Sequence, residues 1–314
     1  MRHRLMAVCG CAVLLATSAC GGGEDDGGPR EVTAGVIAIV DVAPIYLGKE
    51  QGFFEKRGID LKLEIGSGGA AAVPGVVSGN FEFAFGNVTS LLVARDENLP
   101  LKVIANGVNS NGKEGGDFSA VVVPEDSPVK GPEDLEGKTV SANNLKNIGD
   151  TTVRNSVREA GGDPAAVDFV EMGLPEMSPA LDKGQIDAAW VVEPFVSIAL
   201  KDGHREIASN YAEFDKSLTV ATYFTSEQML AEEPELMEDI AAALEESMAY
   251  ADENPDEVRR IIGSYTEIEP ALIDDMRLPR FQPEVDRDSV QKVADLARKD
   301  GLLEKAADVD ELYR

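Results

Sequence analysis

Cysteine and histidine are scarce in this sequence of 314 residues, and their positions exclude several kinds of site. The cysteines, Cys9, Cys11 and Cys20, all lie near the N-terminus, so a chain cleaved before Cys20 keeps one thiol. Such a chain forms neither an internal disulfide nor a cysteine-ligated metal site. Beyond the N-terminal segment the one histidine is His204, which we expect on a surface turn without a nucleophile elbow. The sequence therefore predicts no catalytic residue, no metal and no cofactor.

Clusters of basic residues and long apolar runs are also missing. Lysine and arginine number 29 against 57 acidic residues, and the formal net charge is −28. A surface with this charge repels nucleic acid and anionic lipid, so we expect neither as a binding partner. The glycine-rich segment 66–70 lacks the Gly-Lys-Ser/Thr of a P-loop and the glycine spacing of a dinucleotide-binding turn, which argues against a nucleotide ligand.

The N-terminal segment is typical of a secretory signal. Two arginines precede the apolar run 5–16, which is too short to span a bilayer, and small residues 17–19 lead to Cys20. Small residues before a cysteine resemble a bacterial lipobox. We therefore predict a signal peptide at 1–20, a lipidated Cys20 as the first mature residue and a flexible tether at 21–30. This places the chain outside the cytoplasm on a lipid anchor in the bacterial cell membrane; the alternative is a plain secreted protein.

The remaining chain has enough hydrophobic residues, 43% of the total, to bury a core. Apolar strands alternate with helical stretches, an order that predicts α/β architecture with mainly parallel sheets covered by helices. The predicted strands are 32–40, 59–65, 81–85, 101–105, 118–124, 138–142, 167–172, 186–192 and 219–225.

One strand-ending unit occurs twice. The stretch 184–195 carries the single tryptophan, Trp190, and ends on Glu193 and Pro194; the stretch 79–90 has the same order of glycine, acidic residue and apolar strand. The repeat predicts two similar lobes facing one cleft. We expect the first lobe at 31–124 plus 218–314, with the C-terminal helices packed on it, and the second at 125–217.

The candidate ligand site lies in the loops that follow the strands, because ligands of open α/β sheets bind at the carboxyl ends of the strands. In the first lobe the candidates are Asp41, Ala43, Pro44, Ser67, Gly68, Gly69, Asn87, Val88, Thr89 and Asn106. In the second lobe they are Asn147, Gly149, Asp150, Thr151, Thr152, Met172, Gly173, Trp190, Glu193 and Pro194.

Several of these residues have a structural explanation as well. Ser67, Asp150 and Thr151 stand where ordinary N-caps stand, although helix N-termini there would also direct N–H groups at an anion or a carbonyl. Trp190 is either a core residue or a platform for a ligand ring. Glu193 either ends its strand together with Pro194 or accepts a hydrogen bond from a ligand amine.

Five stretches carry a family resemblance. Residues 42–46, 52–60, 134–140, 184–188 and 193–194 resemble extracytoplasmic solute-binding proteins of ABC importers, of the nitrate/sulfonate/taurine and thiamine-pyrimidine-precursor type. The resemblance implies a two-lobed type II periplasmic-binding fold with two crossing segments. It also implies a small-molecule solute clamped between the lobes and delivered to a permease driven by a cytoplasmic ATPase. We expect a monomer.

The identity of the solute stays open between two classes. Glu193 favours a pyrimidine- or amine-like solute, and the absence of arginine from the candidate loops weakens a sulfonate or nitrate assignment, although neutral N–H donors also hold anions. An enzyme acting on a heterocyclic molecule with the same scaffold is the main alternative function. A ligand-sensing domain of a regulator is disfavoured by the secretory signal and by the lack of a DNA-binding segment.

Overall fold

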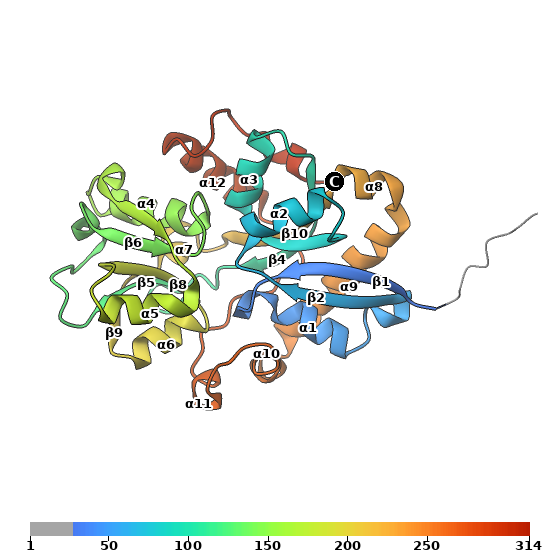
Figure 1. The fold of residues 1–314 in the computed structure, drawn as a ribbon, viewed down its shortest axis with the longest axis horizontal. Coiled ribbons are helices and arrows are strands. Elements are labelled where there is room, and N and C mark those ends of the chain that lie inside the picture. Colours follow the sequence, from blue (N-terminus) through green and yellow to red (C-terminus); the bar gives the residue numbers. More distant parts are fainter. Residues whose placement is uncertain (1–27) are drawn as a thin grey trace, which may run out of the picture.

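The computed structural model describes residues 28–314, which form two lobes side by side (Figure 1). The predicted signal peptide, Cys20 and most of the tether lie outside the described residues. Among residues 28–314 no helix combines the length and the apolar character needed to cross a bilayer.

Each lobe is built on one five-stranded sheet, and the two sheets have the same plan. In order across the first sheet, the strands are β2 (Ile59–Ile65), β1 (Arg30–Val36), β3 (Phe83–Asn87), β10 (Thr219–Ser226) and β4 (Leu101–Asn109). In the second sheet they are β7 (Asp168–Glu171), β6 (Thr139–Ala142), β8 (Ala188–Val192), β5 (Ser119–Pro124) and β9 (His204–Ala208). In both sheets the fourth strand is antiparallel to its neighbours. The repeat therefore places β3 and β8 at equivalent positions, as the matching stretches predict.

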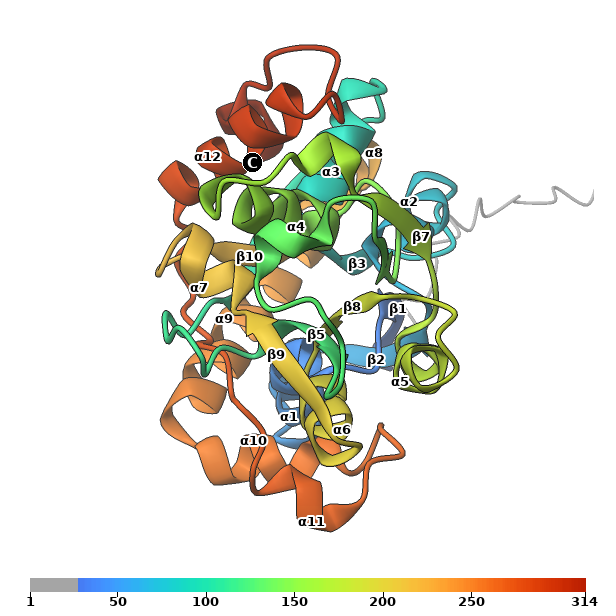
Figure 2. The ribbon, with the colours of Figure 1, turned by 90° about the vertical axis from the view of Figure 1, so that its left-hand side faces the viewer.

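Helices cover both faces of each sheet (Figure 1). Those of the first lobe are α1 (Ala43–Glu50), α2 (Gly69–Val77), α3 (Val88–Asp96), α8 (Glu227–Glu232), α9 (Pro234–Glu253), α10 (Pro255–Ile262) and α12 (Arg287–Lys299). Those of the second lobe are α4 (Ile148–Glu159), α5 (Leu174–Asp182), α6 (Phe195–Lys201) and α7 (Asn210–Phe214). The short α11 (Pro270–Ile273) follows α10 and lies below the junction of the lobes (Figures 1 and 2).

Local sequence explains the long helices. In α9, Ile240, Leu244 and Met248 recur at four-residue spacing and are all buried, so one stripe of this helix packs on the first lobe. In α4, the Asn147 side chain accepts a hydrogen bond from the Asp150 amide at 3.1 Å, and Asp150 accepts one from the Lys146 amide at 2.9 Å. These reciprocal bonds satisfy amides that have no partner inside the helix.

The lobe boundary differs from the prediction at one strand. We expected 118–124 to close the first lobe, but β5 pairs with β8 and β9 in the second sheet. The chain therefore crosses between the lobes before Ser119 and returns before Thr219, where β10 rejoins the first sheet as predicted. Apolar content identifies a strand but not its sheet, because both sheets need the same buried pattern.

The region after β8 is more ordered than the sequence indicates. Residues 195–214 contain α6, β9 and α7, none of which we predicted, and His204 is buried in β9 instead of lying on a surface turn. Its Nε2 lies 3.1 Å from the Ser178 Oγ, which donates to Asp202 at 2.7 Å. Asp182 approaches the same ring nitrogen, at 3.7 Å. A catalytic triad needs the serine and the carboxylate on different ring nitrogens. Here Ser178 and Asp182 both face the Nε2 of His204, so these residues lack that arrangement.

Candidate functional site in the cleft between the lobes

A small cavity of about 40 Å³ lies between the two sheets, at the carboxyl ends of their parallel strands; we name it the cleft cavity. The first lobe lines it with Ile37, Ile39, Asp41, Gly68, Gly69, Phe85, Gly86, Asn87, Val220 and Ala221. The second lobe contributes Asn143, Ile148, Leu174, Trp190, Val192 and Tyr211. Asp41 is the only charged residue of this lining, so its carboxyl group dominates the electrostatics of the cavity.

Asp41 is a buried carboxyl group without a full set of partners. It sits in the short 3-10 helix η1 (Val40–Val42) after β1, its exposed fraction is 3%, and its Oδ1 has no hydrogen-bond partner. Burial raises the pKa of Asp41 to about 7, and the carboxyl group of Asp117 adds to the rise. A buried carboxylate without partners is costly, so a ligand that donates hydrogen bonds or carries positive charge gains from binding here.

The sequence leaves open whether Trp190 lies in the core or faces the cleft. In the structure it does both. Its side chain lines the cleft cavity with an exposed fraction of 4%, while its Nε1 donates to the Ser119 Oγ at 2.9 Å. Its ring packs edge-on against Tyr211 at 6.2 Å. A Cβ at Gly149 would lie 2.4 Å from the ring, so glycine lets α4 pack against this indole. The indole is held rigidly, with its polar atom used inside the lobe.

Glu193 does not line the cleft cavity, contrary to the expectation that it faces a solute. Its Oε1 accepts hydrogen bonds from the Ser197 Oγ at 2.9 Å and the Arg277 amide at 3.0 Å, and its Oε2 accepts one from the Ser197 amide at 3.1 Å. Burial raises its pKa, which the bonds from Arg277 and Ser197 oppose. These contacts anchor α6 and the C-terminal segment. Pro194 lines a different cavity.

The polar side chains predicted around α4 bind the first turn of the helix, and Asn147 is its N-cap. Besides the Asn147–Asp150 pair, the Thr151 Oγ1 donates to the Asn147 carbonyl at 2.8 Å and the Thr152 Oγ1 to the Ile148 carbonyl at 2.6 Å. Burial raises the pKa of Asp150 to about 6, opposed by the nearby Arg154. Within the described chain none of these four predicted side chains lines the cleft cavity. The N-cap of α4 is Asn147 and not Asp150 or Thr151, and the N-cap of α2 is Gly68 and not Ser67, so the predicted caps were wrong by one to four residues.

The other predicted residues divide between cavity wall and core. Gly68, Gly69 and Asn87 join Asp41 and Trp190 in the lining, whereas Ser67 is exposed beside it. The remainder do not line the cavity: Ala43 and Pro44 are buried in α1, Val88 and Thr89 are buried in α3, Met172 is half-buried and Gly173 is exposed. Asn106 also lies outside the lining. It binds the Asn109 side chain at 2.7 Å and the Gln282 carbonyl at 2.7 Å, which secures the C-terminal segment.

Hydrogen bonds across the cleft hold the lobes together. The Asn143 side chain donates to the Ser67 carbonyl at 2.9 Å, and the Ile148 amide donates to the Asn87 Oδ1 at 3.2 Å. The Val40 amide donates to the Glu193 carbonyl at 3.0 Å. The strand-end loops of the two lobes therefore touch directly, and the structure represents a closed state of the cleft.

Several lining residues were absent from the sequence prediction. Tyr211 belongs to α7, a helix that no apolar periodicity in the sequence predicts. Val220 and Ala221 belong to β10, the strand with which the chain returns to the first sheet. Leu174 directly follows the predicted Met172 and Gly173. In the described part of the chain no group of three or more His, Cys, Asp or Glu side chains could hold a metal ion.

The chain is similar to a solved structure in its fold and to two other proteins in its sequence. An alkanesulfonate-binding protein of Xanthomonas axonopodis pv. citri, solved with MOPS, superposes with a TM-score of 0.78 at 16% identity over 91% of this chain and 99% of that chain. A binding protein of Brucella abortus is 24% identical over 76% of each chain. The formylaminopyrimidine-binding protein of Halalkalibacterium halodurans is 22% identical over 69% of this chain and 64% of the relative.

A family model described as NMT1/THI5 like matches residues 39–258, which run from the segment after β1 into α10. The matched residues include both sheets apart from β1 and almost all of the cleft lining. Since this match spans well over half of its length, the chain belongs to the NMT1/THI5-like family.

Proposed function

We propose that this protein is the extracytoplasmic solute-binding component of an ABC importer, which captures a small organic solute between its lobes and delivers it to a permease. The observation that carries the proposal is the buried carboxyl group of Asp41, whose Oδ1 has no hydrogen-bond partner, in a cavity enclosed by two repeated lobes. Relatives named for binding alkanesulfonate and formylaminopyrimidine support a binding role over an enzymatic one.

The cleft chemistry favours a solute that donates hydrogen bonds, an amine or an aminopyrimidine, over a sulfonate or nitrate. Asp41 offers negative charge, and the lining contains no lysine or arginine to neutralise an anion. Asn87 and Asn143 add amide groups, while Phe85, Trp190 and Tyr211 offer faces and edges for a flat ring. A protonated or amino-bearing ring satisfies both sets of groups.

The size of the closed cavity requires the lobes to move apart during solute entry. A volume of about 40 Å³ holds only a few water molecules, since each occupies at least about 10–15 Å³ on this measure. Opening breaks the bonds from Asn143 to Ser67 and from Ile148 to Asn87. The two segments that cross between the lobes are the natural hinges for this motion.

The same proposal includes a lipid anchor at Cys20, followed by the glycine-rich tether, which would hold a monomeric receptor at the outer face of the membrane beside its permease. Cell fractionation tests the anchor: Cys20→Ser should move the protein from the membrane to the soluble fraction. A variant that stays membrane-bound would contradict it.

Isothermal titration calorimetry against a panel of amines, aminopyrimidines, sulfonates and nitrate tests the solute class. We expect an amine or aminopyrimidine to bind, to raise the melting temperature and to change the emission of Trp190. Asp41→Asn should weaken the binding of that solute by at least about tenfold, because it removes one charge-assisted hydrogen bond.

Asp150→Asn is the matched control, because Asp150 is also buried with an unpartnered Oδ1 but lies outside the cavity lining. It should leave solute binding unchanged. Tight binding of a sulfonate that survives Asp41→Asn would reject the amine class while keeping the transport role. Catalytic turnover of the bound solute would reject the transport role itself.

A further inference from the structure

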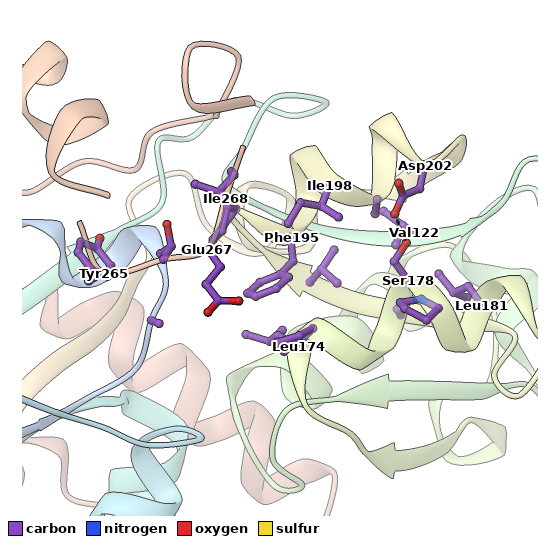
Figure 3. A pocket seen from close by; sticks show the side chains of 18 residues that line it. Val122, Leu174, Ser178, Leu181, Phe195, Ile198, Asp202, Tyr265, Glu267 and Ile268 are labelled. Carbon is purple, nitrogen blue, oxygen red and sulfur yellow. Dashed lines mark hydrogen bonds between the residues drawn. The ribbon is translucent and has the colours of Figure 1, made fainter. Parts of the chain in front are cut away.

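A second and much larger cavity, of about 460 Å³, lies between the second lobe and the segment 265–268 of the first lobe, and we name it the outer pocket (Figure 3). Its floor is the face of β5 and β8 that carries Val122, Ala189 and Val191. Helices α5 and α6 form its two walls. The pocket is partly open to solvent, and its volume falls in the range of about 300–1,000 Å³ that small-molecule sites occupy.

The walls of the outer pocket are almost entirely apolar. Leu174 and Leu181 project from α5, and Phe195 and Ile198 from α6, toward the shared space (Figure 3). Leu174 is the one residue that lines both the outer pocket and the cleft cavity, and all other lining residues of the two cavities differ. The outer pocket is therefore distinct from the site to which we assign the solute.

The first lobe closes the outer pocket. Ala38 and the segment 265–268, which follows α10, complete its lining. That segment is well anchored: the Tyr265 hydroxyl donates to the Ile39 carbonyl at 3.0 Å, and the Tyr265 ring stacks on Tyr46 at 4.0 Å. An occupant would contact both lobes at once.

The charges of the lining have one sign. Asp202 stands at one end with its carboxylate beside Ser178, and Glu267 directs its carboxylate toward Phe195 and Leu174 (Figure 3). The lining includes no lysine or arginine, and the one nearby histidine, His204, already binds Ser178. An apolar space between two carboxylates is complementary to an apolar cation.

We propose that the outer pocket is a second binding site, separate from the cleft, for a small amine with an aromatic or alkyl body. The body lies on Val191 between Phe195 and Leu181, and the ammonium group pairs with Glu267 or Asp202. Because the occupant contacts Ile268 of the first lobe as well as α5 and α6, it favours the closed arrangement of the lobes.

Phenethylamine is the probe, and phenylacetate is its matched anion. We expect phenethylamine to bind with a Kd of roughly 1 mM, the affinity of a ligand with few atoms, and phenylacetate to bind at least about tenfold more weakly. Saturation-transfer NMR measures both. Ala189→Ile, which fills the floor of the pocket, should abolish phenethylamine binding, whereas Asp41→Asn should leave it unchanged.

Glu267→Gln provides a test that does not depend on tolerance of a larger core residue, because Glu267 is exposed on the rim. This variant should weaken the binding of phenethylamine about twofold to fivefold and leave the binding of phenethyl alcohol unchanged. The proposal is overturned if Asp41→Asn abolishes phenethylamine binding, if neither Ala189→Ile nor Glu267→Gln changes it, or if phenylacetate binds equally well. Loss of phenethylamine binding in Asp41→Asn would place the amine in the cleft and so support the solute class proposed there, whereas the other two outcomes leave the cleft proposal untouched.

Discussion

Asp41 and Glu193 are two buried carboxyl groups that follow strands in opposite lobes and lie close together, since the Val40 amide donates to the Glu193 carbonyl. Three hydrogen bonds saturate the Glu193 carboxylate, whereas the Asp41 Oδ1 has no partner. Both side chains are buried carboxyl groups, and they differ in the number of hydrogen-bond donors that face them. Asp41 is therefore the candidate binding group, because it combines unused hydrogen-bonding capacity with a place in the cavity lining, whereas the acceptors of Glu193 are already occupied.

The largest expected effect comes from removing the saturated carboxylate. Glu193→Ala leaves the Ser197 and Arg277 amides and the Ser197 hydroxyl without their acceptor, so we expect a loss of about 3 kcal/mol in the free energy of unfolding. Urea unfolding measures it. Glu193→Gln keeps one carbonyl acceptor and should cost less. A loss below about 1 kcal/mol for Glu193→Ala would place Glu193 among the dispensable groups.

The carboxyl group of Asp41, whose Oδ1 has no partner, should lower the stability of the fold when it becomes charged, whereas the Glu193 carboxylate raises it. The folded-state pKa of Asp41, about 7, lies above its ordinary value of 3.8, so the folded protein binds the proton more tightly than the unfolded chain. The contribution of Asp41 to stability is therefore fully present below pH 3.8 and is lost as the pH rises through about 7. Between pH 5 and 8 this loss amounts to roughly 2–3 kcal/mol.

Asp41→Asn removes that titration, so we expect the variant to gain roughly 2–3 kcal/mol over the wild type as the pH rises from 5 to 8. Thermal or urea unfolding at several pH values checks this expectation. A difference between the two proteins that does not change with pH would mean that the Asp41 carboxylate is solvated or paired in solution.

The smallest expected effect comes from comparing alanine variants of Asn87 and Asn147, the two asparagines that cap α3 and α4. Asn87 caps α3 through the Ser90 amide at 2.9 Å and also accepts from Ile148 of the other lobe, whereas Asn147 caps α4 within its own lobe. Each change to alanine should cost about 1 kcal/mol of stability. Only Asn87→Ala should favour the open state, which small-angle X-ray scattering detects as a larger radius of gyration. Equal radii for the two variants would remove Asn87 from the closing contacts.

The sequence predicts the architecture well, because architecture depends on repeated local patterns. Apolar strands followed by glycine and a helix occur in both halves, and these patterns identify two lobes and place Asp41, Gly68, Gly69, Asn87 and Trp190 at the shared edge. The return of the strand near Thr219 to the first sheet was also predictable, since the C-terminal helices that follow it need a sheet to cover.

Two features could not be read from the sequence. Strand β5 looks the same whichever sheet it joins, and its membership depends on long-range pairing with β8 and β9. The role of Glu193 depends on Arg277, a residue distant in sequence whose backbone amide supplies one of the three bonds. Side-chain chemistry indicates what a group can accept, but only the folded chain shows whether that acceptor is already occupied.

The position of β10 has a consequence for the order of folding. This strand lies between β3 and β4, so the first sheet is incomplete until residue 226 has been synthesised, after every strand of the second sheet. A fragment ending after β4 lacks an inner strand and exposes two unpaired strand edges. The N-terminal lobe is thus the last to be completed during synthesis, because the strand that fills its sheet follows every strand of the second sheet.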